Sequence, residues 1–151
     1  MADWQASVEP GEIFFVPGLG SCVGLAVYDA VAGVAGLAHI MLPDSGGDAA
    51  GRPAKFADTA VLHLVAELVT RGAARDRLVA KAAGGAQMFR SQGDFLAVGA
   101  RNAEAVRQAL ESAGIPAIGT DLGGTWGRTI RFHMGTWVLE VRSPGRPGVE
   151  L

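Results

Sequence analysis

The sequence predicts a mixed, mostly antiparallel α+β sandwich in which two helices pack on sheet. Short apolar stretches of strand-like composition outnumber helical ones, and two of them at the C-terminal end have the alternation of a β-hairpin. Few helical stretches lie between neighbouring strands. A doubly wound parallel sheet is therefore disfavoured, because each of its strands needs a helical crossover.

Two segments have the pattern of helices. In residues 57–71 the apolar side chains recur at the i, i+3, i+4, i+7 spacing, and Gly72 follows as a stop signal. We expect this helix to bury one face and to leave the other in solvent. A second helix is expected to begin after Asn102, a good N-cap, and to end at Gly114 and Pro116.

Strand signals are shorter and more numerous. In chain order they are residues 12–16, 22–29, 34–42, 77–82, 94–99, 115–120, 128–134 and 137–142. The last two form a predicted hairpin around Gly135-Thr136. The segments 43–53 and 143–151 are rich in glycine and proline. We expect a single domain, 1–151, that is folded over about 11–142 and ends in a mobile tail, 143–151.

Length, composition and charge narrow the class of protein. The chain has 151 residues, 49% of them hydrophobic, which suits one domain with a substantial core. It has no apolar run of about twenty residues, and its start lacks the features of a signal peptide, so we expect a cytoplasmic protein without membrane insertion. A net charge of −2 without a basic block gives no sign of nucleic-acid binding.

The only cysteine lies in the glycine-rich stretch PGLGSCVG, residues 17–24. A lone cysteine cannot form an internal disulfide, so in a reducing compartment it stays a thiol. If the turn of the hairpin formed by 22–42 is centred between Ala30 and Val31, Cys22 lies directly opposite His39. Moving the turn centre by one residue instead places His39 opposite Gly24, with Cys22 on a looser diagonal.

A cysteine beside a histidine and among glycines suggests acyl transfer. An imidazole close to Cys22 raises its thiolate fraction, so His39 is a candidate general base. Gly20 lets the backbone approach a substrate, and the N–H groups around Ser21 to Val23 are candidate donors to an oxyanion. The structural alternative is that Cys22 is a small buried apolar residue and His39 an ordinary core histidine.

Other kinds of site find no support in the spacing. The glycines at 18, 20 and 24 miss the dinucleotide fingerprint, and the loop lacks the Gly-Lys-Ser/Thr end of a phosphate-binding loop. Cys22 and the three histidines lack metal-ligand spacing. We expect neither a metal nor a cofactor, and the expected partner is a protein or a small molecule.

Six short sequence motifs occur along the chain, in the order GLGSCVGLAVYD, GLAHIMLP, KFADTA, AKAAGGAQMF, GARN and DLGGTWGR. Together they resemble the CheD family of chemoreceptor glutamine deamidases over about residues 11–141. The resemblance implies a three-layer α/β sandwich related to the catalytic domains of deamidating toxins. It also implies that Cys22 is the nucleophile and His39 its partner, acting on glutamines in the cytoplasmic helices of methyl-accepting chemotaxis receptors.

The implied reaction passes through a thioester on Cys22, releases ammonia and leaves glutamate; a methylesterase side activity is expected for the same reason. One position departs from the family, because the threonine that commonly lies six residues before the cysteine is Val16 here. A backbone carbonyl, Thr120 or Asp121 then orients His39, or the third member is dispensable, or activity is reduced.

Two further interpretations stay open. In the first, the protein is a binding module: the resemblance implies that some members associate with a CheC-type phosphatase of the response regulator, and the groove around Cys22 is then a docking surface. In the second, Cys22 is a redox-active thiol in a structural protein. Lys81, Arg101 and Arg128 either meet an acidic receptor surface or pair with local groups.

Overall fold

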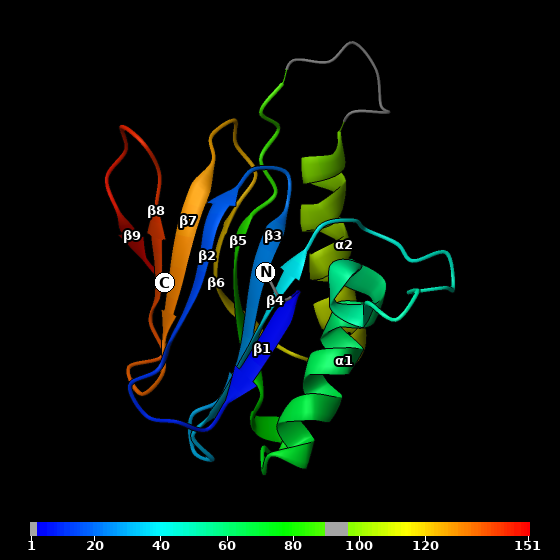
Figure 1. Ribbon diagram of the computed structural model, residues 1–151, viewed down its shortest axis with the longest axis vertical. Coiled ribbons are helices and arrows are strands. Elements are labelled where there is room, and N and C mark those ends of the chain that lie inside the picture. The colour runs from blue at the N-terminus through cyan, green and yellow to red at the C-terminus, as the bar shows by residue number, and fades with distance from the viewer. Residues whose placement is uncertain (1–2, 90–96) are drawn as a thin grey trace.

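The computed structural model describes residues 3–89 and 97–151. It has three layers (Figure 1): two helices cover one face of a five-stranded sheet, and a four-stranded sheet covers the other face. The helices are α1 (Ala57–Thr70) and α2 (Val98–Ala113). The predicted fold class, a mostly antiparallel α+β sandwich with two main helices, is confirmed.

The five-stranded sheet has the order β1-β4-β3-β5-β6, and only its β5–β6 pair is parallel. Its strands are β1 (Trp4–Ser7), β3 (Val23–Asp29), β4 (Val34–Ile40), β5 (Val79–Gly84) and β6 (Ala117–Leu122). The four-stranded sheet has the order β2-β7-β8-β9 and is antiparallel throughout. Its strands are β2 (Ile13–Leu19), β7 (Arg128–His133), β8 (Leu139–Arg142) and β9 (Val149–Glu150). The predicted hairpin around Gly135-Thr136 is the β7–β8 pair.

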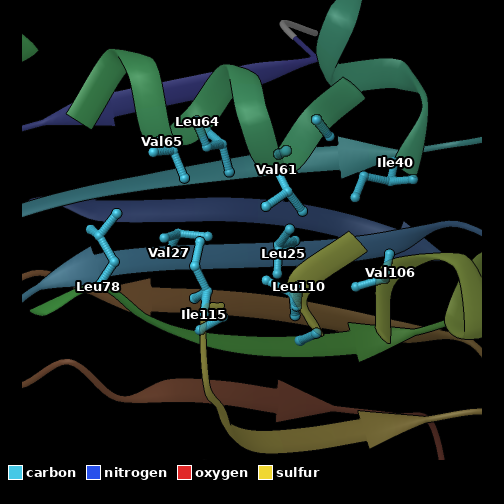
Figure 2. Close-up of a cluster of buried hydrophobic side chains, with 14 of the residues drawn as sticks. Leu25, Val27, Ile40, Val61, Leu64, Val65, Leu78, Val106, Leu110 and Ile115 are labelled. Atoms are coloured by element: carbon cyan, nitrogen blue, oxygen red, sulfur yellow. The ribbon is translucent and has the colours of Figure 1, made fainter. Parts of the chain in front are cut away.

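Strand β3 lies at the centre of the molecule, and all of its residues are buried. Leu25 and Val27 pack under the helices, as Figure 2 shows. Ala26 and Tyr28 point the other way, into the core between the two sheets. A strand covered on both faces has no polar side, which is why this part of the sequence is a continuous apolar run.

The helix predicted over 57–71 is confirmed as α1, whereas the predicted start of the second helix is wrong. Gly72 ends α1 with φ 104°, as expected. Helix α2 begins at Val98, not after Asn102. The strand predicted over 94–99 is also wrong at its end, because Val98 and Gly99 form the first turn of α2. Residues 94–96 lie outside the described chain. Tertiary packing sets this start: a Cβ on Gly99 would lie 2.1 Å from the Ala86 carbonyl oxygen, so only glycine lets the first turn pack this closely.

The expected boundaries of the folded part, 11–142 with a tail, are too narrow. At the N-terminal end β1 pairs with β4. At the C-terminal end β9 pairs with β8, and Leu151 exchanges two backbone hydrogen bonds with Leu139, of 2.9 and 3.1 Å. Both additions are short edge strands, of four and two residues, which leaves little side-chain periodicity in the sequence. No helix in the described ranges has the length and apolar character needed to cross a membrane.

The β3–β4 register differs from the one first expected. Gly24 lies opposite His39, and Val23 lies opposite Ile40. The prediction that Cys22 directly faces His39 is therefore wrong, and the alternative register with a diagonal relation is the observed one. Cys22 immediately precedes β3 on this diagonal.

The turn between β3 and β4 explains this register. Asp29 Oδ1 accepts hydrogen bonds from the backbone N–H groups of Val31 and Ala32, each 3.0 Å long. Gly33 completes the turn with φ 70°. With these contacts, the four residues 30–33 connect the two strands. The turn is therefore centred one residue later than in the register first expected. The fully buried Asp29 carboxylate also pairs with Arg77 at 2.9 Å.

We expect Asp29→Ala to lower the free energy of unfolding by about 2–4 kcal/mol, because it removes a buried acceptor and leaves its backbone donors unpaired. Urea denaturation measures the loss. Glu111→Ala is the matched control, since Glu111 is an exposed acid on α2, and it is expected to change stability by less than about 0.5 kcal/mol. Equal stability of the two variants would contradict the role assigned to Asp29.

The same carboxylate gives a pH dependence. Burial raises the pKa of Asp29, but hydrogen bonds from Arg77 and from the backbone outweigh it and lower this pKa from 3.8 to about 2. A carboxyl whose pKa is lower in the folded state stabilises the fold above its unfolded pKa, and this contribution disappears as pH falls towards 2. The stability difference between the parent and Asp29→Ala is therefore expected to shrink between about pH 4 and pH 2.

Candidate active site

The candidate nucleophile lies at one end of the interface between the two sheets. Cys22 is half-buried, directly before β3, and packs against the core that the sheets enclose. His39 on β4 is also half-buried and follows Leu37 on the same face of its strand, a face that points into this core. The fold therefore brings Cys22 and His39 to one face of the five-stranded sheet. They lie at the start of β3 and near the end of β4, two neighbouring strands in Figure 1.

Glycine at position 24 leaves no β3 side chain beside His39, but Ile130 of the opposing sheet packs against this glycine. A Cβ on Gly24 would lie 2.2 Å from Ile130 Cδ1, so the opposing sheet already fills that position. Within the described chain, Cys22 and His39 do not form a direct hydrogen bond. Diagonal residues of an antiparallel pair are roughly 7–8 Å apart, a gap that side chains narrow and that substrate binding commonly tightens.

The backbone on both sides of Cys22 is anchored by the segment that follows β5. The Gly20 carbonyl accepts a hydrogen bond from the Ala86 N–H at 2.9 Å, and the Cys22 carbonyl accepts one from the Gly85 N–H at 2.8 Å. Gly84 permits this approach, since a Cβ there would lie 2.2 Å from the Cys22 oxygen. The segment AKAAGGA, residues 80–86, thus holds the loop that contains Cys22.

The three candidate oxyanion donors are not equivalent. Val23 is the first residue of the β3 ladder and is paired with both Ile40 and Gly84. Ser21 and Cys22 precede this ladder, and both are partly exposed. Their N–H groups lie outside the strand pairing, which makes them the better placed candidates for holding an oxyanion.

A small cavity of about 140 Å³ adjoins His39. It lies between the edges of the two sheets and is lined by Asp3, Trp4, Gln5, Phe15, Val16, Leu37 and His39. The Nδ1 atom of His39 is buried and lacks a hydrogen-bond partner among the described residues. Val16, the residue at the family's threonine position, therefore shares a cavity with an imidazole that has an unpaired nitrogen.

Neither of the two side chains considered as substitutes reaches His39. Thr120 and Asp121 lie on β6, and strands β3 and β5 separate β6 from β4. Three strand spacings amount to roughly 14 Å. The Asp121 carboxylate instead pairs with Arg128 at 3.0 Å. Arg128 is only 2% exposed, so it is a structural link between the two sheets and not a contact for an acidic receptor.

The other two basic residues also lie away from the thiol. The Lys81 ammonium donates hydrogen bonds to the backbone carbonyls of Trp137 and Leu151. Arg101 is exposed and lines a larger groove, of about 860 Å³, between α1 and α2. That groove contains neither Cys22 nor His39. Its size therefore does not make it the site of the chemistry.

The electrostatics favour a neutral resting pair. Burial raises the pKa of the Cys22 thiol above its ordinary value. Burial also lowers the pKa of His39, and the Asp3 carboxylate only partly opposes this effect. A thiol and a neutral imidazole are therefore expected near neutral pH, and a neutral imidazole is the form that can accept a proton.

We expect the rate of Cys22 alkylation by iodoacetamide to keep rising beyond pH 9, because the thiolate forms only near a raised pKa. Cys22 is the only cysteine, so the mass added beyond that found in Cys22→Ser, whose amines also react slowly at high pH, reports this residue. A rate that is already constant below pH 7 would indicate a preformed thiolate–imidazolium pair and would contradict the neutral pair.

Sequence reasoning missed Asn102. The sequence predicts an N-cap at this position, but Asn102 lies inside α2, is fully buried, and donates from Nδ2 to the carbonyls of Ser21 and Met41, each at 2.9 Å. One signal was available: Asn102 is in phase with Val106 and Leu110 on the apolar face of the helix. A polar residue in that position is unusual unless it has a buried partner.

Comparisons with known proteins agree with one another. Residues 41–143 match a family described as CheD chemotactic sensory transduction; this segment begins two residues after His39. A probable chemoreceptor glutamine deamidase CheD of Moorella thermoacetica is 52% identical over 153 residues, covering 97% of this chain and 90% of that protein. The chemoreceptor glutamine deamidase CheD of Thermotoga maritima is 46% identical, covering 96% and 90%.

A solved structure extends the likeness to the fold. The Bacillus licheniformis hypothetical protein YfiH superposes with a TM-score of 0.54 over 82% of this chain, at 18% identity, and this chain spans 51% of that protein. At this identity the likeness concerns the architecture alone. The family match and the relatives that cover nearly the whole sequence lead to one conclusion: the chain belongs to the CheD family.

Proposed function

We propose that this protein is a cytoplasmic deamidase of chemoreceptor glutamines, with Cys22 as the nucleophile and His39 as the general base. The observation that carries the proposal is the convergence of the only cysteine and a half-buried histidine on one face, beside two backbone N–H groups outside the strand pairing. The names of relatives at 46% and 52% identity support the choice of substrate.

In the first half of the reaction, Cys22 Sγ attacks the side-chain carbonyl carbon of the glutamine while His39 accepts the thiol proton. The carbonyl oxygen becomes an oxyanion, which the N–H groups of Cys22 and Ser21 stabilise. When the tetrahedral intermediate collapses, the carbon–nitrogen bond breaks, and His39 returns its proton to the leaving nitrogen. Ammonia departs and a thioester remains on Cys22.

In the second half, His39 removes a proton from water, and the resulting hydroxide attacks the thioester carbonyl. Collapse of this intermediate breaks the carbon–sulfur bond. Glutamate leaves, and Cys22 recovers its proton from His39. A histidine that starts neutral suits both halves, because it acts first as a base in each.

The same thioester would form from a glutamate γ-methyl ester, with methanol leaving in place of ammonia. A methylesterase side activity is therefore part of the proposal. Association with a CheC-type phosphatase also stays a prediction. Full restoration of chemotaxis by Cys22→Ala in a deletion strain would favour such a binding role over catalysis.

The test is to incubate the protein with receptor cytoplasmic fragments and to follow glutamine-to-glutamate conversion by peptide mass spectrometry. We expect conversion by the parent and none by Cys22→Ala. His39→Gln, which keeps a polar side chain but not the base, is expected to lose at least about a hundredfold in rate. Methylated fragments with a methanol assay test the side activity. A folded parent that converts no glutamine in several receptors would contradict the proposal.

We expect Val16→Thr to raise kcat for deamidation by up to about tenfold, the value of one added hydrogen bond. The threonine hydroxyl would accept from the unpaired His39 Nδ1 across their shared cavity and so fix the tautomer in which Nε2 is the base. Val16→Ala is the control, because it changes the volume without adding a hydroxyl. An unchanged kcat in Val16→Thr would show that the imidazole needs no such partner.

A further inference from the structure

We propose that Asn102 is a positioning residue that aims the N–H of Cys22 at the oxyanion, a role that rests on the proposed function. Its side chain is fully buried in α2 and joins two carbonyls from opposite sides of the site, those of Ser21 and Met41. Ser21 precedes the nucleophile, and Met41 follows His39 by two residues. A single amide group thus connects the two catalytic segments.

This contact lies where the strand pairing stops. The last pair of the β3–β4 ladder is Val23 with Ile40. In the same register the next pair would be Cys22 with Met41. The Met41 N–H donates to the Lys55 carbonyl at 2.8 Å instead. At this point the Asn102 amide replaces the hydrogen bonds between the strands. One of its N–H groups donates to the segment before β3, and the other donates to the segment after β4.

The hydrogen bond to Ser21 determines the direction of the neighbouring N–H. In a trans peptide the carbonyl of one residue and the N–H of the next point in opposite directions. The Ser21 carbonyl points at Asn102, so the Cys22 N–H points away from the helix layer. The Cys22 side chain also lies away from that layer, in the core between the sheets. The thiol and this donor are therefore presented on the same side.

Two features argue that Asn102 does more than stabilise the fold. Its Oδ1 atom is buried without a partner in the described part of the chain, and an unpaired buried acceptor costs stability. The helix turn that carries it is also held tightly, since a Cβ on Gly99 would lie 2.1 Å from the Ala86 oxygen. Asn102 is therefore a buried polar residue in a tightly packed helix turn, and both of its N–H donors bond to the segments that carry Cys22 and His39.

Asn102→Ala is tested with two probes of Cys22 that differ in chemistry. Acylation by p-nitrophenyl acetate develops an oxyanion, whereas alkylation by iodoacetamide does not. We expect acylation to fall by about 10- to 100-fold and alkylation to stay within about threefold of the parent. Cys22→Ala supplies the background. Val106→Ala, a truncation of a fully buried residue on the same helix, is the matched control and should retain the parental ratio of the two rates.

Equal losses in both reactions, or an equal change of ratio in Val106→Ala, would overturn the proposal, because a general loosening of the site explains either. If Asn102→Ala does not fold, Asn102→Ser keeps one donor and is expected to give an intermediate ratio; a parental ratio there would also overturn it. Neither probe contains a receptor. A parent that fails to convert receptor glutamine while showing the expected ratios would refute the substrate and leave the role of Asn102 standing.

Discussion

The turn that Asp29 holds sets the register of β3 and β4, and the candidate site depends on that register. Its buried carboxylate accepts two backbone N–H groups inside the turn and pairs with Arg77. The resulting pairing puts Gly24 opposite His39. A slip by one residue would turn the side chains of a strand to its other face, and the imidazole would then point at the helices instead of towards the second sheet.

The three layers divide the work around Cys22. Helix α2 and the segment after β5 hold the backbone of the loop that contains Cys22, through Asn102, Gly85 and Ala86. The opposite side, between the sheets, receives the thiol and the imidazole. Because β3 is buried on both faces, the hydrogen bonds that hold the Cys22 loop come from one side, and the candidate catalytic side chains lie on the other. Val16 lines the same small cavity as His39, whose buried Nδ1 has no hydrogen-bond partner among the described residues.

Local patterns were enough to predict much of the fold and to single out Cys22 and His39 as candidate site residues. The periodicity of 57–71 gave α1, alternation gave the β7–β8 hairpin, and the glycine-rich stretch with a lone cysteine drew attention to Cys22. The features that failed depend on contacts distant in sequence. Asn102 forms hydrogen bonds with Ser21 and Met41, which lie 81 and 61 positions away in the sequence. Without these distant partners, a helix cap is the natural local interpretation. Likewise, the separation of Asp121 from His39 follows from strand order, which no short stretch of sequence contains.

The most direct test of the account is mass spectrometry of the Cys22 peptide, after rapid acid quenching of a single turnover with a receptor fragment. The account requires a thioester that joins the substrate glutamyl group to Cys22, appears before glutamate accumulates, and then decays. Its timing would also show which half of the reaction limits the rate. Conversion of the glutamine in a single turnover through an adduct elsewhere, with Cys22 unmodified throughout, would contradict the account at its centre.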